Sequence, residues 1–408
     1  MSFEKTPLNE FITLQRGFDL PKGDRAEGTV PVIASTGIGG YHNTAKVDAP
    51  GVVIGRSGSI GGGQYIQEPF WPLNTTLWVK DFKGHDPRYI YYLMRSIDFT
   101  KFNVGSGVPT LNRNHLSSLL VNELGIDREK AISKQLGDLD DKIALNTQTN
   151  QTLEQMAQAI FKSWFVDFDP VKAKMNGELP EGMDAATASL FPEKLVESEL
   201  GLIPEGWEVG TLDTHTSMII DHRGKTPKKL GSDWVEEGYP AISAKNIKSK
   251  KIVRPDTIRF IDEATYKKWM KEPLVKGDII MTSEAPMGEL YFFDGSQDFC
   301  LSQRLYGLRA NSDICSPEFL FNWLQTTKAK ADMEGRASGT TALGIKQAEL
   351  RKVKILTPPR ELLEQYSVVA SNLVDMAAKN NAQNTTLEAL RDTLLPKLLS
   401  GEIELDKE

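Results

Sequence analysis

The sequence predicts an α+β protein built from two homologous halves, each a mixed α/β globular part followed by one long helix. Two observations predict this architecture. A long heptad pattern occurs twice in the 408 residues, and residue pairs in the segments before each copy also recur. A repeat at a nearly fixed offset is strong evidence about architecture, and two helices of this kind are expected to form a coiled coil with each other.

The first long helix is predicted between about Asp127 and Asp169. No Gly or Pro falls between Asp138 and Phe168, so the segment should form one helix of nearly forty residues, roughly 60 Å long at 1.5 Å per residue. Its seam residues alternate four and three apart, as the a and d positions of a coiled coil do. They are Ile132, Leu136, Leu139, Ile143, Asn146, Asn150, Leu153, Ala157, Ile160 and Trp164.

The second helix repeats this seam after a shift of 234 positions. The shifted seam consists of Tyr366, Ala370, Leu373, Ala377, Asn380, Asn384, Leu387, Arg391, Leu394 and Leu398. Both copies have Asn at two successive seam positions, and a buried Asn fixes the register of a coiled coil at a cost in stability. We therefore expect these polar residues to face each other where the two helices meet.

The globular parts repeat more loosely. Arg16-Gly17 recurs as Arg223-Gly224, and Ser106-Gly107 recurs as Ser338-Gly339. Short β-branched runs punctuated by Gly and Pro predict parts rich in strands. The expected boundaries are a first globular part at 1–126, a helix at 127–168, a connection at 169–200, a second globular part at 201–358, a helix at 359–400 and a tail at 401–408.

The composition of the chain indicates the cellular compartment in which it works. The net charge is −7, with the acidic surplus on the helical segments and the globular parts neutral to basic. Only Cys300 and Cys315 are present, which is typical of a reducing compartment and excludes a disulfide framework. No apolar run reaches the roughly 20 residues that a membrane span needs, and the N-terminal stretch lacks the apolar core of a signal peptide. We therefore expect a cytoplasmic protein with no membrane partner.

Motifs for independent catalysis are absent. Arg223–Thr226 reads RGKT, the end of a phosphate loop, but position 219 is Ile where that motif needs Gly. The five histidines have no metal-ligand spacing, and the acids of Asp138–Lys142 are expected on the solvated face of the coil. The sequence therefore predicts neither a catalytic site nor a cofactor or metal site.

The block AQAIFKSWFVDFDPVKAKMNGE at Ala157–Glu178, the IPEGWE entry to the second half and the duplicated order resemble the specificity subunit of type I restriction-modification enzymes. The resemblance covers essentially the whole chain. It implies that each globular part is a target recognition domain for one half of a split site in double-stranded DNA. It also implies that the two helices form an antiparallel coiled-coil spacer.

The same resemblance implies the partners. Two methyltransferase subunits would supply S-adenosylmethionine chemistry at adenine, and two motor-endonuclease subunits would add ATP- and Mg-dependent translocation and cleavage. The chain itself would be a non-catalytic DNA reader and scaffold. Aromatic residues at the end of the first helix could pack against a domain or a partner subunit, and the candidates are Phe161, Trp164, Phe165 and Phe168.

Candidate DNA contacts lie in loops beside the repeated strands. Gly-rich turns allow close backbone approach, Lys and Arg suit phosphates, and a Glu can accept a hydrogen bond from a cytosine amino group. In the first half the candidates are Arg56, Ser57 and Ser59. In the second half they are Lys225, Thr226, Lys228, Lys245, Lys248, Thr282, Ser283 and Glu284.

Two other functions stay open at this point. One is a coiled-coil scaffold whose end domains bind protein, which DNA-binding measurements would separate from a DNA reader. The other is the specificity module of a related modification system with a different catalytic partner.

Overall fold

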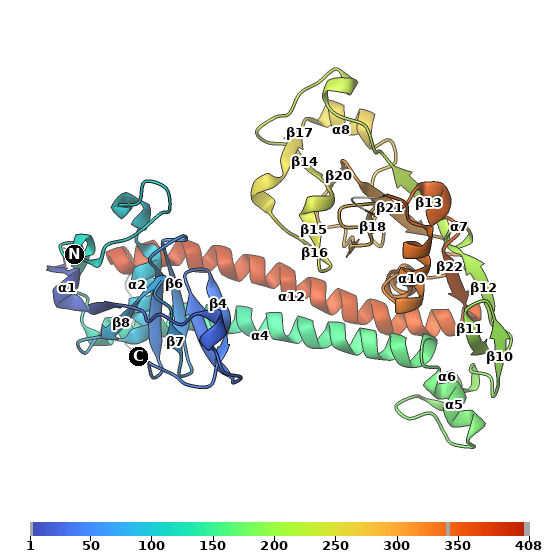
Figure 1. The fold of residues 1–408 in the computed structure, drawn as a ribbon, viewed down its shortest axis with the longest axis horizontal. Helices are drawn as coiled ribbons and strands as arrows, with labels where there is room; N and C mark the ends of the chain where they lie inside the picture. Colours follow the sequence, from blue (N-terminus) through green and yellow to red (C-terminus); the bar gives the residue numbers. More distant parts are fainter. Residues whose placement is uncertain (1–2, 340–342, 404–408) are drawn as a thin grey trace. The chain divides into compact units, whose positions relative to one another are not determined.

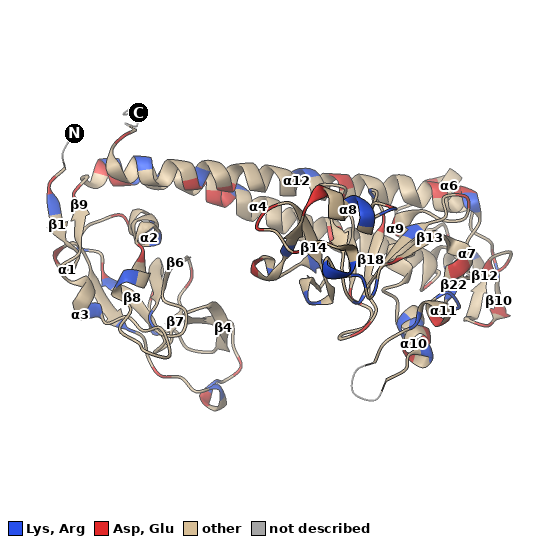
Figure 2. Cartoon of the chain, turned by 90° about the horizontal axis from the view of Figure 1, so that it is seen from above, with Lys and Arg blue, Asp and Glu red and all other residues tan. Residues whose placement is uncertain are grey.

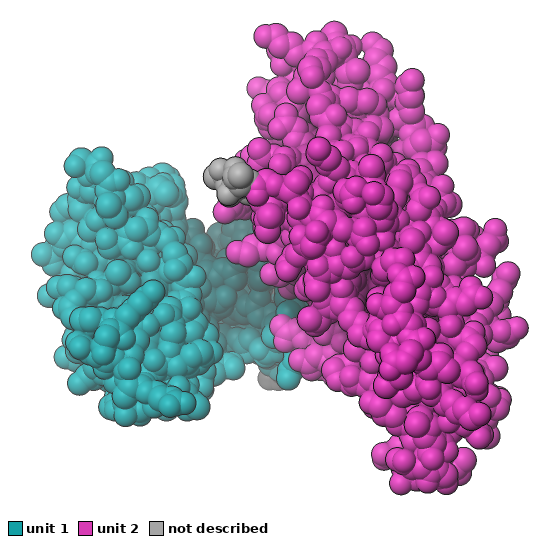
Figure 3. All heavy atoms as spheres, turned by 45° about the vertical axis from the view of Figure 1, so that its right-hand side comes forward, with its two compact units in different colours: residues 1–148, 380–408 teal, residues 149–379 magenta. Residues whose placement is uncertain are grey.

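The structure is a computed structural model that describes residues 3–339 and 343–403. The chain divides into two compact units, coloured separately in Figure 3, and each is described by itself. Unit 1 comprises Met1–Gln148 and Asn380–Glu408, and unit 2 comprises Thr149–Lys379. Each unit therefore contains one globular part together with a segment of each long helix.

Unit 1 is built on two sheets. The four-stranded antiparallel sheet has the order β2-β8-β5-β6, and a three-stranded mixed sheet has the order β4-β3-β7, with β3 and β7 parallel. The strands are β1 (Lys5–Pro7), β2 (Thr13–Arg16), β3 (Val30–Ala34), β4 (Gly37–His42), β5 (Gly51–Gly55), β6 (Gly61–Ile66), β7 (Trp71–Pro72), β8 (Thr76–Asp81) and β9 (Leu120–Asn122), of which β1 and β9 pair separately.

Helix α2 (Pro87–Ser96) covers β5 and β6 and carries much of the core of unit 1. Its N-cap is Asp86, whose carboxylate accepts from the Tyr89 backbone N–H at 2.9 Å. Tyr89, Ile90 and Met94 are buried on its inner face. The other helices before the coil are short: α1 (Leu8–Phe11), α3 (Arg113–Leu116) and the 3₁₀ turns Lys22–Asp24 and Phe99–Phe102.

Unit 2 repeats both sheets strand for strand, which confirms the predicted internal repeat. The orders are β13-β21-β18-β19 and β17-β14-β20, and β12-β22 corresponds to β1-β9. These strands are β12 (Glu208–Thr211), β13 (Thr216–Asp221), β14 (Tyr239–Ile242), β17 (Arg259–Ile261), β18 (Ile279–Thr282), β19 (Leu290–Phe292), β20 (Cys300–Leu301), β21 (Leu305–Ala310) and β22 (Lys354–Thr357).

Unit 2 also contains elements that unit 1 lacks. Two hairpins are added, β10 (Leu195–Ser198) with β11 (Gly201–Pro204) and β15 (Ile247–Lys248) with β16 (Lys251–Ile252). Its helices are α5 (Asp169–Met175), α6 (Ala185–Ser189), α7 (Leu212–His215), α8 (Glu263–Trp269), α9 (Pro317–Trp323), α10 (Thr327–Arg336) and α11 (Gln347–Leu350), with 3₁₀ turns at Lys228–Leu230, Ala244–Asn246 and Pro255–Thr257.

The two long helices are α4 (Ile126–Phe165) and α12 (Arg360–Ser400), and they lie side by side in Figure 1. Sequence reasoning expected 127–168 and 359–400. Helix α4 ends earlier because the chain turns at Phe168, which has a left-handed φ of 57°, before α5 begins. All twenty predicted seam positions are buried or half-buried.

Contacts along the seam run in opposite directions on the two helices. In unit 1, Asp140 pairs with Arg391 at 2.8 Å, and Asn146 bonds to Asn384 at 2.8 Å. In unit 2, the Asn150 side chain donates to the Ala377 carbonyl at 3.3 Å, while Phe161 packs on Tyr366. Residue numbers that rise along α4 meet falling numbers along α12, so the coiled coil is antiparallel, as predicted.

The acids of Asp138–Lys142 are not simply solvated, contrary to expectation. The Arg88 guanidinium of α2 binds both carboxylate oxygens of Asp141, at 2.6 and 2.9 Å, and donates to the Gly137 carbonyl at 3.1 Å. A Cβ on Gly137 would come within 2.7 Å of that guanidinium, so only glycine permits this approach. Arg88 holds the pKa of Asp141 below its usual range. These contacts fasten the globular part of unit 1 to α4.

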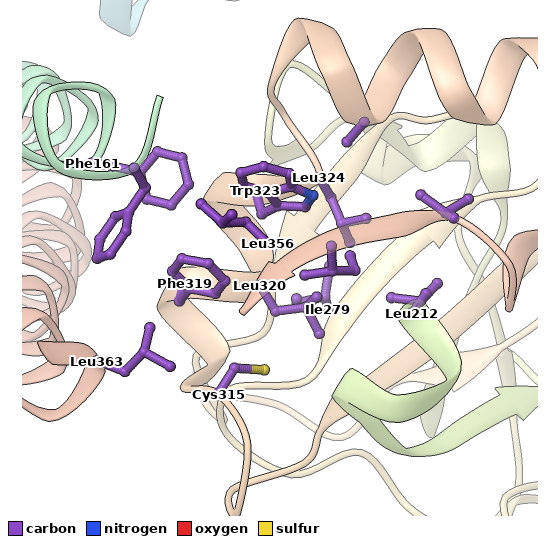
Figure 4. Close-up of a cluster of buried hydrophobic side chains, with 14 of the residues drawn as sticks. Phe161, Leu212, Ile279, Cys315, Phe319, Leu320, Trp323, Leu324, Leu356 and Leu363 are labelled. Carbon is purple, nitrogen blue, oxygen red and sulfur yellow. The ribbon is translucent and has the colours of Figure 1, made fainter. Parts of the chain in front are cut away.

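Of the two partners expected for the aromatic block at the end of α4, the structure shows a domain of the same chain, and the assignment to a partner subunit is corrected. Phe161, Phe165 and Phe168 are at most 5% exposed and lie in the main core of unit 2, where Figure 4 shows Phe161 near Phe319. Trp164 is half-buried and packs edge-on against Phe191. Segments far apart in the sequence cover this block, so it is not a free surface for a partner subunit.

None of the helices in the described part of the chain combines the length and the apolar composition that crossing a membrane requires.

Candidate nucleic-acid interface

Unit 1 has a cationic cavity at the end of its four-stranded sheet. This cavity, named here the Arg56 cavity, has a volume of about 650 Å³. Its charged lining residues are Arg16, Arg56 and Arg113, and Gln15 and Asn112 add amide groups. No acidic residue is among the described residues that line it. Three guanidinium groups with two amides can bind phosphates and base edges alike.

Arg56 is held in place by the backbone around it. It follows β5 directly, its N–H donates to the Thr75 carbonyl at 2.8 Å, and its carbonyl accepts from the Leu111 N–H at 2.8 Å. Its Nη1 donates to the Asn74 carbonyl at 3.3 Å. The predicted candidates Ser57 and Ser59 follow on the same turn, half-buried and exposed respectively, but they do not line the cavity.

Unit 2 has a second cationic cavity, named here the Lys225 cavity, with a volume of about 550 Å³. Figure 2 shows basic segments of the chain beside α8 and β14, which border it. Its basic lining residues are Lys225, Lys228, Lys245, Arg259 and Arg304, against a single acid, Asp233. Thr226, Ser243, Ser302 and Gln303 add hydroxyl and amide groups. Four of the predicted DNA contacts, Lys225, Thr226, Lys228 and Lys245, are thus brought together here.

Several of these groups are already oriented by the fold. Lys225 donates from Nζ to the Trp269 carbonyl at 3.0 Å, and the Arg259 guanidinium stacks 3.8 Å above the Trp234 ring. Cation–π stacking keeps the edge of a guanidinium free to donate. The cavity therefore presents donors on a framework that is largely fixed beforehand.

Thr282 and Ser283 do not fit the role that the sequence suggested. Thr282 is fully buried, and its hydroxyl donates to the Pro286 carbonyl at 2.6 Å and accepts from the Glu289 N–H at 2.9 Å. Ser283 is 2% exposed. Their polar atoms shape the turn after β18, so neither side chain is available to DNA in this conformation. Glu284 is half-buried and forms an ion pair with Arg304 at 2.9 Å.

Lys248 lies on the β15–β16 hairpin, exposed and outside the cavity lining. At the tip of this hairpin, Lys250 forms an ion pair with Glu154 of α4, and the Ser249 N–H donates to Glu289 at 2.8 Å. Burial, and to a lesser extent Lys330, lower the pKa of Lys250. The segment from Lys245 to Arg259, which reads KNIKSKKIVRPDTIR and is rich in basic residues, is therefore divided, because part of it lines the cavity and part of it fastens the hairpin to α4.

Sequence reasoning missed Arg16, Arg113 and Arg304. Arg259 ends the basic cluster Lys245–Arg259, which the sequence alone marks as a candidate for binding phosphates. Arg16 carried a signal, because Arg16-Gly17 recurs as Arg223-Gly224. Arg223 itself pairs with Asp221 at 2.7 Å and stacks 4.4 Å from the Tyr306 ring, outside the cavity lining. Arg113 and Arg304 stand in no motif, and only folding places them beside the other basic residues.

One histidine lies near two carboxylates, although no metal-ligand spacing was found. His85, Glu123 and Glu129 have ligand atoms within 4.8 Å of one another. His85 Nδ1 lies 2.7 Å from Glu129 Oε1, and the Asp86 N–H donates to the other Glu129 oxygen at 3.0 Å. Glu129 is completely buried. These bonds tie the start of α4 to the turn before α2, and none of the three residues lines the Arg56 cavity.

Three comparisons with known proteins bear on this interface. A family profile described as "Type I restriction modification DNA specificity domain" matches residues 2–155 and 204–384. The type I restriction enzyme HindI specificity subunit of Haemophilus influenzae is 29% identical over 363 residues, covering 78% of this chain and 77% of that protein. The MjaIX specificity subunit of Methanocaldococcus jannaschii is 24% identical over 324 residues, covering 78% and 69%.

Among solved structures, the crystal structure of a type I restriction-modification S subunit from M. genitalium superposes with a TM-score of 0.60. It is 15% identical, and the match covers 100% of this chain and 97% of that one. At this identity the similarity establishes the fold.

Proposed function

Since the chain belongs to the type I restriction modification DNA specificity family, we propose that it is the DNA specificity subunit of such a system. In this proposal each globular part reads one half of a split duplex target, and the paired helices α4 and α12 join the two readers. The chain recognises DNA, and its partners carry out the chemistry.

One observation carries this proposal: both halves have a cationic cavity at the same end of equivalent sheets. In unit 1, Arg16 ends β2 and Arg56 follows β5. In unit 2, Lys225 follows β13 and Ala285 follows β18, the two strands equivalent to β2 and β5. A duplicated cationic site suits a ligand with two separated, similar parts, and duplex DNA offers phosphates and base edges at both.

The lining chemistry supports recognition of bases as well as attraction to phosphates. Lysines such as Lys228 and Lys245 act as mobile point charges, which suit phosphate oxygens. Arginine forks and amides such as Gln303 match the donor and acceptor patterns of base edges in the major groove. The Lys225 cavity contains both kinds of group, whereas the charged groups that line the Arg56 cavity are all guanidinium groups, with amides from Gln15 and Asn112 beside them.

The remaining parts of the proposal concern the assembly. We assign S-adenosylmethionine, ATP and Mg to two methyltransferase and two motor-endonuclease subunits, and none of them to this chain. We place the complex in the cytoplasm, which suits the two free and buried thiols. A related modification system with a different catalytic partner is the second candidate, and the duplicated cavities suit it equally.

The test is to map methylated adenines in the genome of a host that expresses the chain with its methyltransferase subunit. The proposal expects modification at one split sequence with a constant gap, and none when the chain is omitted. Methylation without a common sequence would contradict it. In a second measurement, the purified complex should bind a duplex with the mapped site more tightly than a random duplex, whereas a protein-binding scaffold would bind neither.

A further inference from the structure

The turn after β5 in unit 1 and the turn after β18 in unit 2 have the same pattern of backbone hydrogen bonds. In unit 1, the Arg56 N–H donates to the Thr75 carbonyl at 2.8 Å, and the Leu111 N–H donates to the Arg56 carbonyl at 2.8 Å. In unit 2, the Ser283 N–H donates to the Arg304 carbonyl at 2.8 Å, and the Ile345 N–H donates to the Ser283 carbonyl at 3.0 Å.

These bonds define which residues are structurally equivalent. Arg56 corresponds to Ser283, and Thr75 corresponds to Arg304. The bridges that follow agree, because Ser57 pairs with Thr110 and Glu284 pairs with Gly344. Each half therefore has one arginine in this hydrogen-bonded pair of residues. In unit 1 the arginine is the N–H donor, Arg56, and in unit 2 it is the residue whose carbonyl accepts, Arg304. Aligning the two repeats by sequence does not pair Arg56 with Arg304, because Arg56 is equivalent to Ser283. Only the fold shows that the two arginines occupy partner positions.

Each of the two guanidinium groups is anchored by one acceptor of its own half. Arg56 donates to the Asn74 carbonyl, whose position is fixed by the bond from the Asn74 N–H to the Phe18 carbonyl at 3.0 Å. Arg304 is anchored through Nε by the Glu284 carboxylate at 2.9 Å. Within the described residues, no other bond to the Arg304 guanidinium is found, and its side chain is 54% exposed.

The backbone conformation of Arg304 and of the nearby Ala285 is unusual for non-glycine residues. Arg304 has a φ of 64° and Ala285 a φ of 55°, and both line the Lys225 cavity. Non-glycine residues in this region are uncommon and persist where surrounding structure holds them. The opposing residue, Gly344, has no side chain, and a Cβ there would lie 3.0 Å from the Glu284 Cβ. This arrangement leaves room for the Glu284–Arg304 pair.

We propose that Arg56 and Arg304 are the guanine-reading residues of the two halves, and that Glu284 is the positioning residue of Arg304. Arg304 is anchored at Nε and keeps both terminal NH₂ groups, whereas Arg56 is anchored through one N–H of Nη1 and keeps Nη2 and Nε. In each case two guanidinium nitrogens can donate together to O6 and N7 of guanine, the commonest specific protein–DNA contact. The proposal rests on the proposed function and adds the base type and the residues that read it. It requires a G·C pair in each half of the target.

The test uses the full chain in complex with its methyltransferase, as Arg304→Lys and Arg56→Lys variants. Lysine keeps the charge but lacks the fork, so binding to random duplex should stay unchanged. Each variant should lose about 5- to 150-fold of its discrimination at one G·C position, the range for one bidentate contact. The relaxed positions should lie in different halves of the mapped methylation site, one for each variant.

Glu284→Ala should relax the same position as Arg304→Lys, and Glu284→Gln, which keeps an acceptor, should relax it less. The matched control is Arg336→Lys. Arg336 pairs with Asp332 at 2.8 Å in the same unit but lines neither cavity, so its variant should keep the wild-type site. All variants should keep the wild-type melting temperature within a few degrees, which separates misreading from misfolding.

Three results would overturn the inference. They are a wild-type site without a G·C pair in one half, an Arg304→Lys variant with the wild-type site, and an equal loss of specific and random binding, which would make Arg304 a phosphate contact. Failure of the proposed function looks different, because the wild-type complex would then methylate no split sequence at all.

Discussion

The polar layer in the seam gives a prediction that can be worked from the structure. Asn146 is 2% exposed, and its Nδ2 donates at 2.8 Å both to Gln383 Oε1 and to Asn384 Oδ1. Asn146→Leu removes both bonds and leaves a half-buried amide oxygen on Asn384. At about 0.5–1.5 kcal/mol for each bond, the free energy of unfolding should fall by about 1–3 kcal/mol.

Replacing both partners should reverse the sign. In the double variant Asn146→Leu with Asn384→Leu, two apolar side chains meet at seam positions and no acceptor of this pair remains unsatisfied. Such replacements are neutral or stabilising, because the cost of desolvating the amides is removed. The melting temperature should fall by about 2–4 °C per kcal/mol in the single variant and return to or exceed the wild-type value in the double variant.

Calorimetry measures the melting temperatures, and spin labels measure the register. Leu145 and Leu390 are 55% and 45% exposed, and labels there would report the distance between the helices within unit 1. Burial raises the pKa of both Cys300 and Cys315 to about 12, so the native thiols should react slowly at neutral pH. The double variant should broaden the distance distribution, because the Asn pair fixes the register. A double variant less stable than the single one would refute the reasoning.

Three further predictions follow from other contacts. Phe165→Ala, at a ring that is 0% exposed, should lower the free energy of unfolding of unit 2 by about 3–5 kcal/mol in denaturant titrations, and a loss below about 1 kcal/mol would contradict its place in the core. Burial lowers the pKa of His215, so stability that is fully present above the unfolded-state pKa of about 6.5 should be lost as the pH falls below it; His215→Gln should weaken this dependence, and an equally steep pH profile would contradict it. One heptad added to both long helices lengthens each by ~10 Å, so the gap between the methylated half-sites should widen by up to about three base pairs at ~3.4 Å each; an unchanged gap would show that the helices do not set it.

The coiled coil and the repeat could be predicted because both are periodic along the chain. The seam spacing and the repeat offset place the four seam Asn residues near the helix midpoints, so their meeting was predictable, whereas the particular bond between Asn146 and Asn384 is known only from the structure. The strand order β2-β8-β5-β6 could not be predicted, because it depends on pairing between distant segments. Once the strand order of one half is known, the internal repeat predicts the same order in the other half.

The sites were predictable only where basic residues cluster in sequence. Lys225 and Lys228 lie close together in the chain and share a cavity. Thr282 was misjudged because polar residues after an apolar run suggest a surface loop, whereas it ends a strand inside the sheet. For the Phe161 block the sequence left a domain and a partner subunit open, because the residues that cover it, such as Phe319, are distant in sequence. Arg304 was missed because its ion pair with Glu284 joins residues that are apart in the sequence and is seen only in the structure.

The central claim is that each half of the chain reads its own half of the DNA target. The most direct measurement replaces residues 201–358 with the equivalent part of a relative, keeps both long helices, and maps methylated adenines in the host genome. One half of the methylated sequence should change to that of the relative, while the other half and the gap stay as they were. A change in both halves, or in neither, would contradict the claim.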